Sequence, residues 1–283
     1  MIRPPSKDFR VFSPHYPLRC SRRGVLRFAA AASLGHRLVA RGEDPKAGPP
    51  RRIVAIGGGT LNSVDRDRRL LRYVLSLTGR ACPTICMLPT ASGDNLDQIV
   101  GWYEMLHGLD CRPRHVRLFG PPNRPRDFAT QLLAADAIFV SGGNTLNMLA
   151  VWRDQGIDAV LREAWEKGIV LAGESAGMNC WFEESVTDSR PEGLTAMRCL
   201  GWLPGSVCPH ANNPQRMPAY HELLLAGKLS GGLACDDGAA VVFEGDRLAR
   251  AVAISDKALA KRVFVREGVV VEEPLDREIL PAP

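Results

Sequence analysis

Ser175 lies in a short stretch whose residue types and spacing are typical of a catalytic serine. The stretch "GIVLAGESAGMNCWF", Gly168 to Phe182, begins with an apolar run, reaches "GESAG", and continues with residues that favour a helix. A strand, Gly-x-Ser-x-Gly and a helix form the nucleophile-elbow arrangement, in which a tight turn lifts the hydroxyl above the sheet edge. The helix starting near Ala176 would direct free N–H groups at the same place, where they could hold an oxyanion. The alternative is a turn that uses small residues only for packing.

A serine hydroxyl needs a base to take its proton and an acid to orient that base. His210 is the preferred base, because it lies in "GSVCPHANNP", a Pro- and Asn-rich loop that follows a short β run. Asp188, in "SVTDSRPEG", lies between the serine and the histidine and is the first candidate for the acid. The competing carboxylates are Glu183, Glu184, Asp236 and Asp237.

Two further glycine motifs follow predicted strands. In "FVSGGNTLNML", the N–H group of Gly142 or Gly143 could supply a second oxyanion donor, and Asn144 alternatively caps the helix that follows. The segment "IGGGTLN", with glycines 57–59, departs from the dinucleotide pattern G-x-G-x-x-G. It predicts a turn that lets another part of the chain approach closely, and no nucleotide site.

The elements that must position these residues alternate along the chain. Short apolar runs ended by Gly or Pro are typical of buried parallel strands, and helical patterns lie between them. The predicted strands are Ile53–Ile56, Thr84–Thr90, His115–Phe119, Ala137–Gly143 and Gly168–Gly173. The predicted helices are Asp65–Gly79, Ser92–Gly108 (with Ser92 or Asp94 as N-cap), Asn144–Gly156 and Asp158–Gly168. This alternation predicts an α/β fold with a mainly parallel, doubly wound sheet.

The pattern changes after residue 200, where "AAVVFEG", "LARAVAIS" and "RVFVREGVVVEE" are short β runs. They predict a C-terminal β extension of the sheet, antiparallel or at its edge. No internal repeat and no low-complexity linker follows residue 50. The simplest prediction is therefore one domain over residues 50–283.

The formal net charge of +5 comes from the first 45 residues, which hold nine Lys or Arg and three Asp or Glu. The rest of the chain sums to about −1, so the charge gives no support for nucleic-acid binding. The leader is basic, then weakly apolar, with "SRRGVLR" resembling a twin-arginine signal and a cut expected after Ala40. This order favours export to a periplasmic or other extracytoplasmic location. A disordered basic tail on a cytoplasmic protein is the alternative.

The eight cysteines contain no C-x-x-C pair, so zinc and thioredoxin-like sites are not indicated. We expect mostly buried thiols and no metal. No run reaches the roughly 18 apolar residues of a spanning helix, so no membrane span is predicted.

Several segments together resemble the peptidase family of dipeptidase E and cyanophycinase, which has a class I glutamine amidotransferase-like fold. The segments are "FVSGGNTLNML", "GIVLAGESAGMNCWF", "LGWLPGSVCPHANN" and "GLACDDGAAVVFEGD". In order and spacing the resemblance covers roughly residues 52–246. It implies a serine hydrolase of small aspartyl peptides, which needs no cofactor.

The resemblance assigns a role to each matching position. It implies Ser175 as nucleophile, His210 as base and Asp188 as the acid. The N–H groups of Gly143 and Ala176 match the positions that form the oxyanion hole.

The resemblance also marks candidates for substrate binding. Arg216 falls where a family arginine binds the substrate's aspartate carboxylate, a task that suits a planar, permanently charged guanidinium. Asn144 is a further candidate. Glu174 departs from the family, since dipeptidase E usually has Trp beside the nucleophile. A carboxylate there would repel an acidic substrate or favour a free amino terminus.

The leading hypothesis is an N-terminal Asp-X dipeptidase that works by acyl transfer. Alternatives are a cyanophycinase-like hydrolase of aspartyl polymers, an α/β-hydrolase esterase, and a non-catalytic protein that binds a small acidic ligand. The expected partner is a small peptide, with no nucleic acid, and a homo-oligomer is left open.

Overall fold

The computed structural model describes residues 50–61, 64–120 and 127–283. The predicted leader, with its twin-arginine motif and expected cleavage point, lies outside the described residues. Within them, no helix is long and apolar enough to cross a membrane.

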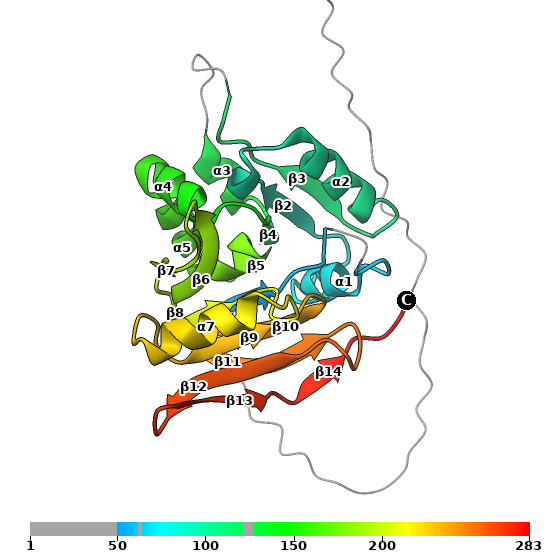
Figure 1. The fold of residues 1–283 in the computed structure, drawn as a ribbon. Coiled ribbons are helices and arrows are strands. Elements are labelled where there is room, and N and C mark those ends of the chain that lie inside the picture. The colour runs from blue at the N-terminus through cyan, green and yellow to red at the C-terminus, as the bar shows by residue number, and fades with distance from the viewer. Residues whose placement is uncertain (1–49, 62–63, 121–126) are drawn as a thin grey trace, which may run out of the picture.

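The chain forms two β-sheets flanked by helices (Figure 1). The first sheet has the strand order β14-β11-β10-β1-β5-β4-β2-β3. Its strands are β1 (Arg52–Ile56), β2 (Thr84–Leu88), β3 (Arg112–His115), β4 (Ala137–Val140), β5 (Val170–Glu174), β10 (Ala239–Glu244), β11 (Arg247–Ala253) and β14 (Arg277–Ile279). The neighbouring strands β1, β5, β4, β2 and β3 pair in parallel, whereas β10 is antiparallel to both β1 and β11.

The second sheet has the order β13-β12-β9-β8-β6-β7. Its strands are β6 (Phe182–Arg190), β7 (Gly193–Arg198), β8 (Leu203–Cys208), β9 (Gly232–Cys235), β12 (Ala260–Arg266) and β13 (Val269–Pro274). The strands β6, β8 and β9 pair in parallel, and the outer pairs are antiparallel.

Helices cover both faces of the first sheet, as predicted for a doubly wound fold (Figure 1). The helical elements are α1 (Arg69–Ser76), η1 (Thr90–Ser92), α2 (Leu96–Leu106), α3 (Phe128–Leu133), α4 (Thr145–Gln155), α5 (Ile157–Glu166), α6 (Ala176–Asn179) and α7 (Arg216–Leu225). Successive side chains of a strand point to opposite faces, so Val54 and Ile56 pack with α1 and α2 while Ile53 and Ala55 pack with α3, α4 and α5. The core on the second face also contains residues of β8, β9 and β12, so it joins the two sheets.

The mixed α/β fold is confirmed, and several boundaries differ from the predicted ones. The strand expected at His115–Phe119 is instead β3, which ends at His115. The N-cap of α2 is Asn95, whose side chain accepts from the N–H of Gln98, because the carboxylate of Asp94 accepts from the N–H of Phe119.

The C-terminal β runs divide between the sheets, which corrects the expected single extension. β10 and β11 continue the first sheet, as predicted, whereas β12 pairs with β9 in the second sheet. The β6–β7 hairpin was not predicted, and the partly polar β6 sequence, "FEESVTDSR", gave little apolar signal.

Six cysteines, Cys86, Cys111, Cys180, Cys199, Cys208 and Cys235, are free and buried, as expected. Burial raises the pKa of the Cys86 thiol to about 12, so the reactive thiolate is scarce at neutral pH. These thiols fill the core.

Candidate active site

Ser175 occupies the turn between β5 and α6 with a φ of 56° and a ψ of −110°. This conformation is strained for a residue with a Cβ, and such strain is concentrated at functional sites. The flanking glycines are needed because the backbone is crowded. A Cβ on Gly173 would lie 2.5 Å from the carbonyl oxygen of Gly177, and one on Gly177 would lie 2.2 Å from that of Val140. The turn therefore has the backbone features expected of a nucleophile elbow.

His210 contacts Ser175 and a carboxylate at the same time. Its Nε2 lies 2.8 Å from Ser175 Oγ, and its Nδ1 lies 2.6 Å from Asp237 Oδ1. The backbone N–H of His210 donates to the carbonyl oxygen of Gly57 at 3.2 Å, which ties its loop to the end of β1. With the carboxylate on Nδ1, the imidazole is held in the tautomer whose Nε2 can accept the serine proton.

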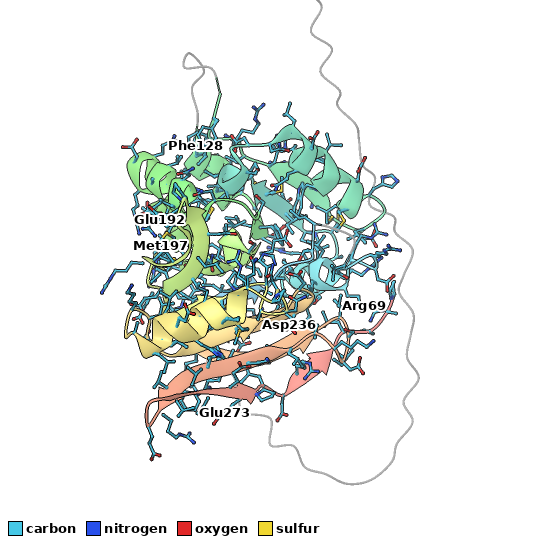
Figure 2. All side chains as sticks on the ribbon, in the orientation of Figure 1. Arg69, Phe128, Glu192, Met197, Asp236 and Glu273 are labelled. Carbon is cyan, nitrogen blue, oxygen red and sulfur yellow. The ribbon has the colours of Figure 1, made fainter. Side chains whose placement is uncertain are left out.

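Strand pairing explains why the histidine and this aspartate meet. β8 and β9 are parallel neighbours, and His210 and Asp237 each follow the last residue of their strand by two positions. The loops after parallel neighbours emerge at the same sheet edge. The N–H of Asp237 also donates to the side chain of Asn212 at 3.0 Å. Figure 2 labels Asp236, the residue before Asp237, in the region between α7 and α1.

The prediction of Asp188 as the orienting acid is corrected by this geometry. The side chain of Asp188 is 60% exposed, and it accepts a 2.8 Å hydrogen bond from Arg216. On β6 its neighbour Thr187 points into the protein, so alternation turns Asp188 outward. Asp188 therefore has another partner, and the carboxylate on His210 is that of Asp237.

The other candidate carboxylates also have partners elsewhere. The acceptor contacts are Glu183 with the N–H of Gly205, Glu184 with the N–H of Ser230, and Asp236 with the N–H of Leu259. Asp237 was among the alternatives. Its place in "CDDG", just after the apolar run that ends at Cys235, was the signal available in the sequence.

The glycine turn after β1 allows a close approach, as predicted. A Cβ on Gly58 would lie 2.4 Å from His210 Cε1 and 2.2 Å from Asp237 Oδ1. The carbonyl of Gly58 also accepts from the N–H of Gly238 at 2.9 Å. The turn therefore packs against the histidine–aspartate pair, and a Cβ at position 58 would displace one of the two side chains.

The loop between β4 and α4 borders the other side of Ser175. A Cβ on Gly142 would lie 3.3 Å from the Cβ of Ser175. Gly143 has a φ of 143°, and a Cβ there would lie 2.2 Å from the carbonyl oxygen of Ala91. Among the described residues, the N–H of Gly143 has no protein acceptor, so it is available to a ligand.

Asn144 was expected to bind substrate, and its polar atoms are engaged within the protein. Its side-chain oxygen accepts from the N–H of Asn147 at 2.8 Å, which caps α4. Its side-chain nitrogen donates to the carbonyl of Ser189 at 3.0 Å. The capping alternative is therefore the correct one for this residue.

Glu174 is a buried carboxylate at the end of β5, only 7% exposed. Its Oε2 accepts from the N–H of Thr60 at 2.8 Å and from that of Leu61 at 3.4 Å. Burial raises the pKa of this carboxyl, while the two backbone hydrogen bonds and the charge of His210 act in the opposite direction. Sequence reasoning did not identify Thr60 and Leu61 as its partners, because the contact spans more than 110 residues.

A cavity of about 420 Å³ opens beside Ser175. Its lining residues are Gly59, Leu61, Asp97, Gln98, Gly101, Gly142, Glu174, Ser175 and His210. Arg216 is not among them. It is 8% exposed at the start of α7 and pairs with Asp188.

A larger cavity, of about 580 Å³, lies elsewhere, between β10, β11, β9 and β12. No serine, cysteine or histidine lines it, so size alone does not identify the reactive site. In the part of the chain that the structure describes, no three His, Cys, Asp or Glu residues gather in a way that could hold a metal ion.

Comparisons with known proteins agree with the fold and with the family predicted from the sequence. The model of "Peptidase family S51" matches residues 53–251. The "Uncharacterized peptidase YgaJ" of Bacillus subtilis (strain 168) is 44% identical over 226 residues, which are 80% of this chain and 97% of that protein.

Two solved structures share the fold. A peptidase from an acI-B1 Actinobacterium superposes with a TM-score of 0.61 at 18% identity, covering 81% of this chain and 95% of that one. A protein from Listeria monocytogenes EGD-e, assigned provisionally to peptidase E, gives a TM-score of 0.54 at 18% identity, covering 73% of this chain and all of that one. With the match of the family model over most of the described residues, the chain belongs to peptidase family S51.

Proposed function

We propose that this chain is a serine exopeptidase that cleaves small peptides by acyl transfer at Ser175. The observation that carries the proposal is the continuous hydrogen-bonded chain from Ser175 Oγ through His210 to Asp237, with contacts of 2.8 and 2.6 Å. A serine hydroxyl is a weak nucleophile until a positioned base accepts its proton, and these contacts provide that base and its orienting acid.

The proposed reaction follows from these positions. His210 takes the Ser175 proton as Oγ attacks the peptide carbonyl, and Asp237 stabilises the imidazolium that forms. The N–H groups of Gly143 and Ala176 hold the oxyanion of the tetrahedral intermediate. His210 then protonates the leaving amine, and water releases the acyl group by the same steps.

The cavity supports a small substrate. A volume of about 420 Å³ lies in the range of small-molecule sites, and Ser175 and His210 line the cavity. This size favours a dipeptide over a long aspartyl polymer.

Specificity for an N-terminal aspartate is the finer part of the proposal, and it depends on Arg216. The guanidinium already binds one carboxylate, that of Asp188, at 2.8 Å. Because Asp188 is exposed, we expect a substrate carboxylate to replace or share this partner at low cost. Arg216 lies six residues after His210. It would then bind the substrate carboxylate between its own loop and the β6 segment that contacts Asn144.

The test is hydrolysis of a panel of X-Leu dipeptides by the chain from residue 43 onward, with Ser175→Ala as the control. Cleavage of Asp-Leu that is lost in Ser175→Ala is the expected result. Cleavage of other dipeptides but not of Asp-Leu would leave the peptidase and remove the aspartyl specificity. Turnover that persists in Ser175→Ala would reject the nucleophile.

A further inference from the structure

The cavity beside Ser175 has an acidic lining. Two carboxylates, those of Glu174 and Asp97, face it, and none of the described residues that line it is a lysine or arginine. Asp97 is exposed on α2, whereas Glu174 is 7% exposed and belongs to the wall next to the nucleophile. The electrostatic field in such a cavity favours a cationic group on the substrate.

Glu174 is fixed in place by the backbone. One carboxylate oxygen accepts the N–H groups of Thr60 and Leu61, so the side chain cannot turn away without losing one buried and one partly buried hydrogen bond. Burial nevertheless destabilises the negative charge, which the raised pKa of this carboxyl reflects. A cation that enters the cavity would supply a charge partner that the protein itself does not place there.

The α-amino group of a substrate is a cation that stays close to the reacting carbonyl carbon. In any peptide the amino nitrogen is two bonds from the carbonyl carbon of its own residue, about 2.5 Å away from standard bond lengths. Attack by Ser175 on the first peptide bond therefore keeps the α-amino group inside the cavity that Ser175 and Glu174 both line. A lysine or arginine side chain would carry its charge farther from the reacting carbonyl.

We propose that Glu174, held by the N–H groups of Thr60 and Leu61, binds the free α-amino group of the residue whose carbonyl Ser175 attacks. Glu174 is then a specificity-determining residue that restricts cleavage to the first peptide bond, and Asp97 adds a weaker attraction at the cavity entrance. This inference rests on the proposed function. The two competing roles for Glu174 are to hold the β1 turn in place or to stabilise the His210 imidazolium, and neither depends on the substrate's amine.

The test compares two substrates that differ only in the amine. Succinyl-Leu is Asp-Leu without its α-amino group, so steric and carboxylate contacts are matched. The variants are wild type, Glu174→Gln and Glu163→Gln, the last as the same change on an exposed glutamate of α5. The Gln carbonyl can still accept from the N–H groups of Thr60 and Leu61. Glu174→Gln therefore removes the negative charge and keeps the hydrogen bonds that hold the side chain in the cavity wall.

We expect the wild type and Glu163→Gln to prefer Asp-Leu over succinyl-Leu by about 10- to 100-fold in kcat/KM, the range for a charge-assisted hydrogen bond. In Glu174→Gln the preference should fall to within about threefold, mainly through a higher KM for Asp-Leu. The wild-type preference should also decline as the pH rises through about 8, where an α-amino group loses its proton.

Equal wild-type rates on the two substrates would overturn the inference. So would an equal loss of both activities in Glu174→Gln, because that result would assign Glu174 to the β1 turn or to His210. If Glu174→Gln does not fold, the wild-type pH profile still decides, since a preference for Asp-Leu that is independent of pH would contradict amine binding.

A second pair of reagents separates this inference from the proposed function. Diphenyl (1-aminoethyl)phosphonate and diphenyl ethylphosphonate both react with activated serines and differ only in the amine. Faster labelling of Ser175 by the amino reagent, lost in Glu174→Gln, would support the inference even if Asp-Leu is not a substrate. Equal labelling by both would overturn the inference and keep the serine nucleophile. No labelling by either would reject the nucleophile and the inference with it.

Discussion

Replacing Asp237 by Asn should reduce hydrolysis far more than replacing Asp188 by Asn. Asp237 lies 2.6 Å from His210 Nδ1, whereas Asp188 lies 2.8 Å from Arg216. An Asn at position 237 keeps the shape but can offer its NH₂ group to Nδ1, which stabilises the tautomer with the proton on Nε2. That tautomer cannot accept the Ser175 proton.

The burial of Asp237 sets the size of the effect. In a fully buried triad, the aspartate-to-asparagine change lowers kcat by about 10⁴-fold. The Asp237 side chain is 25% exposed, so water can solvate part of the developing charge. We therefore expect a smaller loss, about 10²- to 10³-fold, which corresponds to about 2.7–4.1 kcal/mol of barrier. For Asp188→Asn we expect kcat within about threefold of wild type, because exposed ion pairs contribute little.

The assay is steady-state hydrolysis of the best dipeptide from the panel by both variants, with thermal unfolding to confirm that each is folded. Comparable losses in the two variants, or a larger loss in Asp188→Asn, would refute the assignment of Asp237. A loss in Asp237→Asn that appears only in KM would also contradict it, because the imidazolium forms in the transition state.

Three further predictions concern the backbone and the buried carboxylate. Ser175→Gly should be more stable than Ser175→Ala by about 1 kcal/mol or more and should unfold at a higher temperature, since glycine adopts the φ of 56° without strain. Equal melting temperatures would argue against strain at this turn. Gly58→Ala should lower kcat by at least tenfold while the chain stays folded, as its Cβ would displace His210 and Asp237, and unchanged kinetics would contradict the tight packing. The pKa of Glu174 is raised by burial, so its contribution to stability is present below its unfolded pKa of about 4.5 and is lost as the pH rises through the folded value. In denaturant titrations, the free energy of unfolding of Glu174→Gln should therefore increase relative to that of the wild type from pH 4 to pH 7. The reverse trend would mean that the pKa is lowered.

The serine turn and its surroundings could be predicted because their constraints are local. A strand, two crowded glycines and a helix start occur within a few consecutive residues around Ser175, and their order is visible in the sequence. The same holds for the glycine turn after β1 and for the capping role of Asn144. Each depends on neighbours in the chain or on the general rule that a strand end precedes a turn.

The orienting acid depends on contacts between distant segments. His210 and Asp237 meet because β8 and β9 are adjacent and parallel, and that pairing is made by β strands 24 or more residues apart in the chain. Without knowledge of that strand pairing, the chain order Ser–Asp–His favours Asp188. Only the pattern of buried and exposed residues along β6 shows that Asp188 faces outward. The second sheet was missed for the same reason, since the partner of β12 is set by tertiary pairing and the local sequence does not identify it.

The residues of the candidate site come from both sheets. Ser175 and the glycine turn follow strands of the first sheet, whereas His210 and Asp237 follow strands of the second. A displacement of one sheet against the other by about 1 Å would lengthen the 2.8 Å contact between Ser175 and His210 beyond a useful hydrogen bond. The rate of turnover therefore depends on how the two sheets pack against each other. The hydrophobic core that contains residues of both sheets therefore helps to hold Ser175 and His210 within hydrogen-bond distance.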